Sequence, residues 1–189
     1  MKKLILTLTI LFSLMITANA QDVGKMWVGG SVGLSSTKIK GADAVTNYRI
    51  MPEFGYMLSE NMGLGIALGY SHAQSQTEVS ETTVTLKTNT FFVNPFVRYN
   101  FLKGDIGGLF VDGGIMYAHS KVKDFDTKGD MYGVGFRPGA TINIAKNVTF
   151  LGKFGNLGYN HTKAGETKTD WFGFDLDLDQ VELGINFVF

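Results

Sequence analysis

Seven charged residues are the clearest candidates for chemistry, because they stand singly among glycine, small polar and apolar residues. They are Arg49, Glu53, Arg98, Asp112, Arg137, Lys153 and Glu182. A charge removed from water is costly unless an opposite charge compensates it. If the fold buries these four cations and three anions, the chemistry that they indicate is ion pairing with one another.

The remaining reactive residue types match no catalytic pattern. His72, His119 and His161 each lack a serine two residues further on, the spacing that would place a His–Ser pair on one face of a strand. Three aspartates alternate over residues 175–179 and could hold a calcium or bridging cation, although a solvated polar face is the favoured interpretation. The sequence contains no phosphate loop, zinc pattern or catalytic triad, and it contains no cysteine. We therefore expect no enzymatic activity and no cofactor.

The first 20 residues have the organisation of a secretory signal peptide. Lys2 and Lys3 precede an apolar run over residues 4–16, which ends at the small residues of Ala18-Asn19-Ala20. That run is too short to span a bilayer as a helix. We expect cleavage after Ala20, which leaves residues 21–189 as one exported domain without a lipoprotein anchor.

Apolar residues alternate with small or polar residues along the exported part, as in β-strands with one apolar face. Met62, Leu64 and Ile66, for example, alternate with Gly63 and Gly65. No apolar run approaches the roughly 20 residues of a membrane helix. Eight strands are predicted, and the first six span residues 26–37, 48–58, 62–74, 89–101, 108–120 and 131–144. The seventh begins at residue 148 and has a bulge near residue 156. The eighth ends the chain and has a bulge near residue 179.

The connections alternate in length, as in an up-and-down barrel. Short turns are expected at residues 59–61, 103–107 and 145–147, and long charged loops at 38–47, 75–88, 121–130 and 160–170. Pro52, Pro95 and Pro138 recur every 43 residues, which suggests a repeated hairpin. Because proline cannot donate to a ladder, we expect a bulge or a missing rung at each.

The apolar face of such a barrel could point inward or toward lipid. A soluble barrel would turn it inward, but about forty large side chains exceed the interior of an eight-stranded barrel. The opposite face is rich in glycine, alanine, serine and threonine, which makes a poor soluble surface. The sequence therefore predicts an all-β fold, an eight-stranded antiparallel up-and-down transmembrane β-barrel with its apolar face toward lipid.

The tyrosines support this orientation, because all seven fall on the apolar face near a strand end. A phenol is stable where an apolar region meets water, so two rings of tyrosine indicate two membrane interfaces. The predicted aromatic girdle is Tyr48, Tyr56, Tyr70, Tyr99, Tyr117, Tyr132 and Tyr159. The facing of Trp27 is ambiguous from its position near the start of the first strand.

The seven charges named above fall on the opposite, lumen-facing side. We predict that they form one ion-pair network that plugs the lumen, with Arg98 opposite Asp112 on neighbouring strands. A structural role is favoured for this network, and an ion gate that opens by re-pairing is the alternative.

The chain resembles the small outer-membrane β-barrel family that includes OmpX and the membrane domain of OmpA. The barrel domains of this family are often described as porin-like. The resemblance is carried by Ala18-Asn19-Ala20, Pro52-x-x-x-Tyr56, Phe96-Val97-Arg98-Tyr99 and the terminal segment from Leu183 to Phe189. It implies location in the cell outer membrane of a Gram-negative bacterium, and an insertion signal at the end of the chain. That signal would comprise Val181, Leu183, Ile185, Phe187 and Phe189, which are equally the lipid face of the last strand.

The expected function is a structural or surface-interaction role through long extracellular loops. A narrow ion or small-solute channel is the alternative, and a lipid-modifying enzyme is less favoured. Expected partners are membrane lipid and lipopolysaccharide, the outer-membrane insertion machinery and a surface ligand of the loops. Nucleic acid is not expected, because the exported part loses Lys2 and Lys3 and so carries 15 basic against 17 acidic residues.

Overall fold

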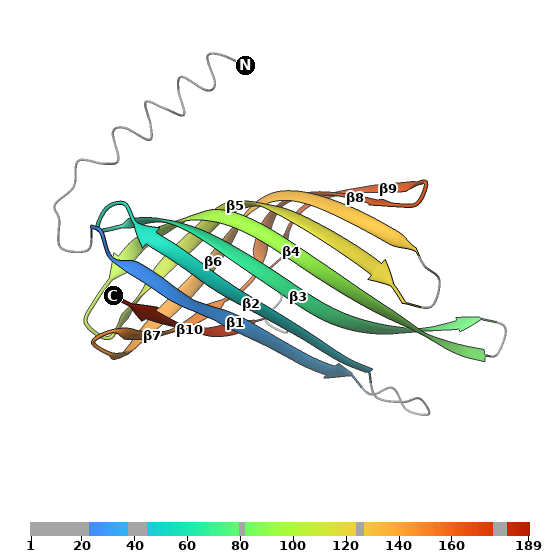
Figure 1. Ribbon diagram of the computed structural model, residues 1–189, viewed down its shortest axis with the longest axis horizontal. Helices are drawn as coiled ribbons and strands as arrows, with labels where there is room; N and C mark the ends of the chain where they lie inside the picture. The colour runs from blue at the N-terminus through green and yellow to red at the C-terminus, as the bar shows by residue number, and fades with distance from the viewer. Residues whose placement is uncertain (1–22, 38–44, 80–81, 124–126, 176–180) are drawn as a thin grey trace, which may run out of the picture.

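The computed structural model describes residues 23–37, 45–79, 82–123, 127–175 and 181–189, and all of its regular elements are β-strands. The strands form one antiparallel sheet that closes on itself (Figure 1). Their bounds are β1 (Met26–Thr37), β2 (Val45–Met57), β3 (Met62–Val79), β4 (Thr82–Lys103), β5 (Gly107–Val122), β6 (Lys128–Ala145), β7 (Val148–Lys153), β8 (Asn156–Ala164), β9 (Thr167–Asp175) and β10 (Glu182–Val188).

These ten strands occupy eight positions in the barrel wall. β7 and β8 both pair with β6, and they are interrupted only by Phe154 and Gly155. Gly155 has a φ of 67°, a conformation that glycine adopts most easily. β10 pairs with β1 and β7, which closes the wall, while β9 pairs with β8. The fold is therefore the predicted eight-stranded antiparallel barrel. The bulge expected near residue 156 corresponds to this interruption, and the one near 179 lies outside the described residues.

The strands at one end continue well past the bounds predicted from sequence. β3 and β4 pair as far as Val79 and Thr82, and β8 and β9 pair as far as Ala164 and Thr167. Prediction of loops at 75–88 and 160–170 was therefore wrong for most of those residues. Their polarity suggested loops, but antiparallel pairing satisfies the backbone and threonine suits an extended strand. At the other end the short turns lie where they were expected.

The prolines interrupt the sheet as predicted. The β2–β3 ladder passes from Ile50 to Glu53, the β4–β5 ladder passes from Val93 to Phe96, and the rungs at Pro52 and Pro95 are missing. On β6, pairing with β8 ends at Phe136 and pairing with β7 begins at Gly139, on either side of Pro138. At each proline, the ladder to one neighbouring strand thus lacks two rungs, while the ladder to the other neighbouring strand is continuous.

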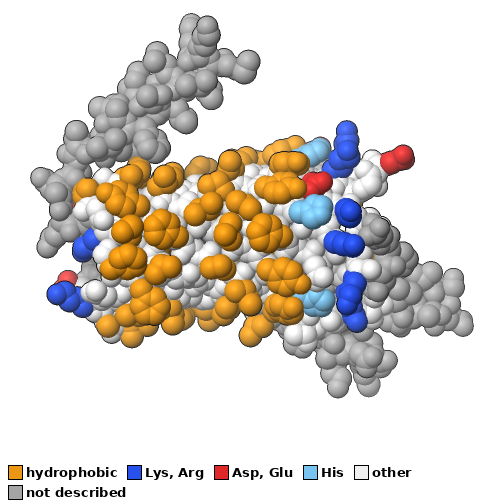
Figure 2. All heavy atoms as spheres, viewed as in Figure 1, with side chains coloured by type: hydrophobic (Ala, Val, Ile, Leu, Met, Phe, Trp, Pro, Cys, Tyr) orange, Lys and Arg blue, Asp and Glu red, His pale blue; other side chains and the backbone are white. Residues whose placement is uncertain are grey.

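The apolar side chains cover the outside of the barrel. On β3, Ile66 and Leu68 are 41% and 45% exposed, whereas Ala67 between them is 1% exposed. Figure 2 shows the resulting broad band of hydrophobic side chains on the visible face of the barrel, with charged groups at the two ends of that face. Within the described part of the chain, no helix has the length and apolar character needed to cross a membrane. The outer surface of the barrel wall is thus apolar, whereas the surface of a soluble protein carries mostly polar side chains.

Inside the barrel, glycines make room for aromatic side chains. A Cβ atom at Gly55 would lie 2.0 Å from the ring of Trp27, and one at Gly139 would lie 2.3 Å from the ring of Phe110. Gly65 leaves space for Phe96 in the same way. The glycine-rich face is therefore the inner wall against which a few large rings pack.

Candidate functional site

Four buried charged residues from four strands form a closed ring across the lumen. Arg98 on β4 donates two hydrogen bonds to Asp112 on β5, Nε to Oδ1 at 2.7 Å and Nη2 to Oδ2 at 2.8 Å. Lys153 on β7 lies 3.3 Å from Asp112 Oδ2 and donates to Glu53 Oε2 at 2.6 Å. Glu53 on β2 completes the ring, with Oε1 3.1 Å from Arg98 Nη2. We call these four residues the lumen ring; its two cations and two anions balance.

A second group lies beside the lumen ring and is centred on Glu182. Arg49 Nη1 donates to Glu182 Oε1 at 2.8 Å, and Arg137 Nη1 donates to Glu182 Oε2 at 3.0 Å. We call these three residues the Glu182 bracket. Glu182 is buried, whereas the two arginines are partly exposed. The bracket therefore carries one excess positive charge on its more open side.

The two groups together contain all seven charged residues singled out in the sequence. Among the described residues no ion pair joins the two groups, but strand pairing places them side by side. Glu182 is the cross-strand partner of Lys153, and Arg137 is the cross-strand partner of Asp112. The seven charges thus form two adjacent groups rather than one continuous chain of contacts.

Polar residues that the sequence analysis did not select complete the site. Trp27 Nε1 donates to Glu53 Oε1 at 3.1 Å, and Asn186 Nδ2 donates to the same oxygen at 2.8 Å. Ser31 Oγ contacts Glu182 Oε2 at 3.4 Å. Asn186 and Ser31 fall on the lumen-facing side of the alternation in their strands, and this position is the sequence feature that could have identified them. Trp27 has the same parity as Ser31, and its ring is buried in the lumen.

Aromatic rings surround the cations of the lumen ring. The guanidinium carbon of Arg98 lies 4.4 Å from the ring centre of Phe110, 5.3 Å from that of Phe96 and 5.4 Å from that of Trp27. Lys153 Nζ lies 5.2 Å from the centre of Phe96. The faces of these rings attract cations. Ion pairs and aromatic rings are therefore packed together at this depth of the lumen.

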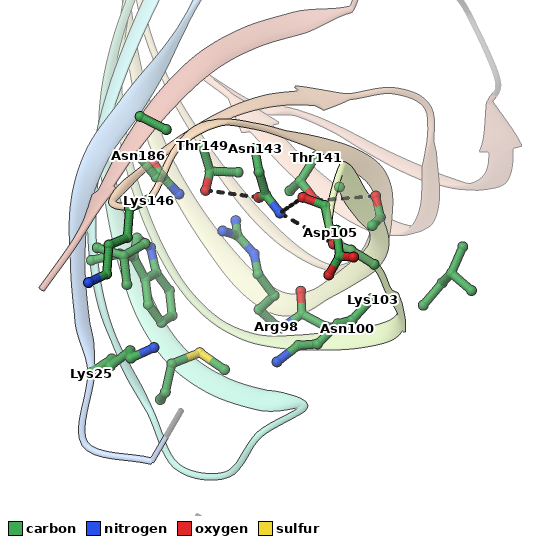
Figure 3. Close-up of a pocket in the computed structure, with 18 residues that line it drawn as sticks. Lys25, Arg98, Asn100, Lys103, Asp105, Thr141, Asn143, Lys146, Thr149 and Asn186 are labelled. Atoms are coloured by element: carbon green, nitrogen blue, oxygen red, sulfur yellow. Dashed lines mark hydrogen bonds between the residues drawn. The ribbon is translucent and has the colours of Figure 1, made fainter. Parts of the chain in front are cut away.

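Cavities open on both sides of this layer of ion pairs and rings. The cavity toward the short turns has a volume of about 520 Å³, and Figure 3 shows Arg98 and Asn186 among its lining residues, with Lys25, Lys103 and Lys146 also around it. One cavity toward the long hairpins has a volume of about 270 Å³ and is bounded by Arg49, Arg137 and Met51, among others. Both cavities therefore end against cations, and the ring lies between them.

The predicted girdle and terminal residues lie on the outside of the barrel. Tyr56 and Tyr99 are exposed near the short turns, and the other five girdle tyrosines lie toward the long hairpins. On β10, Leu183, Ile185 and Phe187 point outward, and Val181 precedes the strand. The backbone of Phe189 pairs with that of Met26, so the C-terminal residue is tied to the first strand.

The described residues contain no cluster of three or more histidine and acidic side chains that could hold a metal ion. His119 and His161 instead each contact one aspartate, Asp130 and Asp170 respectively. Two of the aspartates considered for a cation, at positions 177 and 179, lie outside the described residues.

Comparisons with known proteins agree with this architecture. A family model described as an outer membrane protein beta-barrel domain matches residues 4–189. The chain is similar to the crystal structure of the outer membrane protein OprG from Pseudomonas aeruginosa, with a TM-score of 0.60, 16% identity, and coverage of 91% of this chain and 99% of that one. It is also similar to the crystal structure of Neisserial surface protein A, with a TM-score of 0.50, 14% identity, and coverage of 86% and 94%. At these identities the likeness concerns the fold. No curated protein matched the sequence.

Proposed function

The chain belongs to the family of outer membrane protein β-barrel domains and resides in the outer membrane, and from this premise we propose that it is a closed barrel that acts through its surfaces rather than as a pore. The lumen ring is the observation that carries this proposal. Its four charged side chains are nearly buried and neutralise one another in the middle of the barrel.

The burial of the ring supports a closed lumen on energetic grounds. Each charge has been moved out of water, and each finds an opposite charge within hydrogen-bonding distance. An ion entering the layer would have to separate at least one of these pairs. Eight-stranded barrels of this kind have interiors that side chains can fill completely. The ring therefore acts as a structural plug in this proposal.

The extended hairpins support the surface part of the proposal. β3–β4, β5–β6 and β8–β9 continue beyond the apolar band as paired strands (Figure 1). Paired strands present their side chains in fixed positions, which is suited to binding a neighbouring molecule or surface. In an outer-membrane barrel, the end with long connections faces the outside of the cell. A surface ligand would thus meet a preformed platform.

One observation favours the channel alternative to a limited degree. The Glu182 bracket holds two arginines on one carboxylate, and Arg49 is 36% exposed in its side chain. Such a cation could move away from its partner more easily than Arg98 could. A gate would still require the lumen ring to open, so closure remains the proposed state. We also propose that the protein is not an enzyme, because no histidine has a serine two residues further on, the spacing that would place a His–Ser pair on one face of a strand.

Two features of biogenesis remain proposals as well. We propose that residues 1–20 are removed on export, and that Val181, Leu183, Ile185, Phe187 and Phe189 present the signal that the insertion machinery reads. The outward position of the described β10 side chains supports the second proposal, because a receptor could reach them before the barrel closes.

Electrical recording from planar bilayers tests the closed lumen. Refolded barrel should produce no stable large openings, because the lumen ring blocks the path between the two cavities. An open porin inserted in the same bilayers serves as the control that a pore would be detected. Stable openings from purified, singly inserted barrels would contradict the plug and would favour the channel alternative.

A further inference from the structure

A Tyr-x-His pattern occurs three times in the sequence and accounts for every histidine. The copies are Tyr70-Ser-His72 on β3, Tyr117-Ala-His119 on β5 and Tyr159-Asn-His161 on β8. Each lies on a strand that runs toward the long hairpins. Because residues two apart share a face, each histidine lies on the outward face, beyond its tyrosine.

The histidines share a common arrangement with the neighbouring strand. His119 and His161 lie directly opposite Asp130 and Asp170 in the strand register, and His72 lies opposite Asn89. His119 Nδ1 is 2.8 Å from Asp130 Oδ1, and His161 Nδ1 is 2.7 Å from Asp170 Oδ1. His72 Nδ1 is 2.7 Å from Asn89 Oδ1.

The tyrosines reinforce two of these pairs. Tyr117 Oη donates to Asp130 Oδ1 at 2.7 Å, and Tyr159 Oη donates to Asp170 Oδ1 at 2.5 Å. The hydrogen bond from His119 is the main cause that holds the pKa of Asp130 below its usual value, and that from Tyr159 does the same for Asp170. Both aspartates are therefore ionised near neutral pH and committed to groups of the barrel itself.

Beyond the tyrosines and the histidines, a third row of outward-facing side chains follows two residues further along each strand. Lys121 and Lys163 continue the outward face of β5 and β8, and their cross-strand partners are Lys128 and Lys168. On β3 the same position is Gln74, opposite Lys87. Figure 2 shows histidine side chains at the end of the apolar band and lysine side chains beyond them.

The four strands β5, β6, β8 and β9 thus carry one continuous outward patch with more positive than negative charge. We call it the rim belt and define it by Tyr117, His119, Lys121, Lys128, Asp130, Tyr132, Tyr159, His161, Lys163, Lys168 and Asp170. Pairing of β6 with β8 joins its two hairpins, and places Asp130 opposite Lys163. Glu166 lies beyond the belt, in the turn between β8 and β9.

The depth of the rim belt indicates its partner. The tyrosines mark the end of the apolar band, so the histidines and lysines lie where lipid headgroups meet water. The groups that a row of lysine ammonium donors would contact at that level are the phosphates of lipid headgroups. A protein ligand would have to approach through the headgroup layer to reach outward positions so close to the apolar band.

We propose that the rim belt binds the phosphate groups of phosphorylated lipid in the outer leaflet, with the four lysines supplying charge and hydrogen-bond donors and the tyrosine–aspartate–histidine contacts fixing the wall beside them. Bound lipid would lie against β5, β6, β8 and β9. This inference concerns the outside of the wall and does not depend on whether the lumen conducts.

Titration of lipid into refolded full-length barrel in phosphatidylcholine nanodiscs tests the proposal. The probe is diphosphorylated lipid A, and dephosphorylated lipid A is the reference. The K163Q/K168Q variant should bind the phosphorylated probe about tenfold more weakly or worse, because each lysine near a charged lipid surface contributes severalfold to affinity. K25Q/K146Q removes two lysines at the opposite end, and should retain affinity within about twofold.

Two further arms make the result specific. The H119N/H161N variant should weaken binding of the phosphorylated probe and leave the reference unchanged. Inorganic phosphate at the concentration of the lipid should not displace the probe, because the belt is built for a headgroup held at the membrane surface. The proposal is overturned if the two lysine variants behave alike, if the reference lipid binds as tightly as the probe, or if inorganic phosphate displaces it.

Discussion

Replacing Glu53 by glutamine should destabilise the folded barrel by about 3–5 kcal/mol, the range seen when one partner of a buried ion pair is removed. Glu53 contacts both cations of the lumen ring and also accepts hydrogen bonds from Trp27 and Asn186. Without its charge, Arg98 and Lys153 share the single carboxylate of Asp112. Equilibrium unfolding of the refolded barrel in urea, in lipid vesicles, measures the loss.

Two further variants separate this effect from a general loss of negative charge. E166Q removes an exposed carboxylate in the turn between β8 and β9, and should change stability by less than about 0.5 kcal/mol. The double variant E53Q/K153M also removes the cation left without its partner, and should be more stable than E53Q alone. Two results would contradict the charge balance of the lumen ring. One is a stability loss in E53Q no larger than that in E166Q, and the other is a loss in the double variant equal to the sum of the losses from its two single substitutions.

Truncation of Phe110 to alanine should cost about 3–5 kcal/mol, the usual range for a large aromatic ring removed from a core. Phe110 is fully buried, packs over the guanidinium of Arg98 and fits against Gly139. Loss of the Phe110 side chain leaves a void between the lumen ring and the cavity near the short turns. The same unfolding experiment measures the change.

The matched control is Phe101, which lies on the outside of β4 and is 55% exposed. F101A removes the same side chain from a surface that lipid can cover, so no closed void remains and the loss should be less than half as large. Equal losses at the two positions would show that the inner and outer faces of the wall are energetically alike, contrary to the packed lumen.

The fold could be predicted from sequence because the side-chain period of a strand assigns every residue to one of two faces. Ile66, Ala67 and Leu68 illustrate this, since their exposed fractions follow the alternation. The extent of the hairpins could not be predicted in this way. Residues 75–79 and 82–88 are mostly polar, and the alternation of Val84 and Leu86 with polar residues is too short to reveal a strand.

The site was predictable only where its members are neighbours in the wall. Arg98 and Asp112 lie opposite each other on adjacent strands joined by a short turn, so their pairing follows from the turn position. Lys153 and Glu53 are 100 residues apart and meet across the lumen from β7 and β2, which are not paired. Such a contact depends on barrel closure and on the long lysine side chain. Trp27 lies one residue inside its strand, where alternation is too short to fix its facing.

Sided labelling of single cysteines tests closure of the lumen most directly, and the cysteine-free chain provides a clean background. N100C lines the cavity near the short turns, and M116C lines the cavity toward the long hairpins. In vesicles with uniformly oriented barrel, a small charged methanethiosulfonate reagent added at the long-hairpin side should modify M116C and leave N100C unreacted. Addition at the other side should give the reverse. Modification of both cysteines from one side would contradict a plugged lumen.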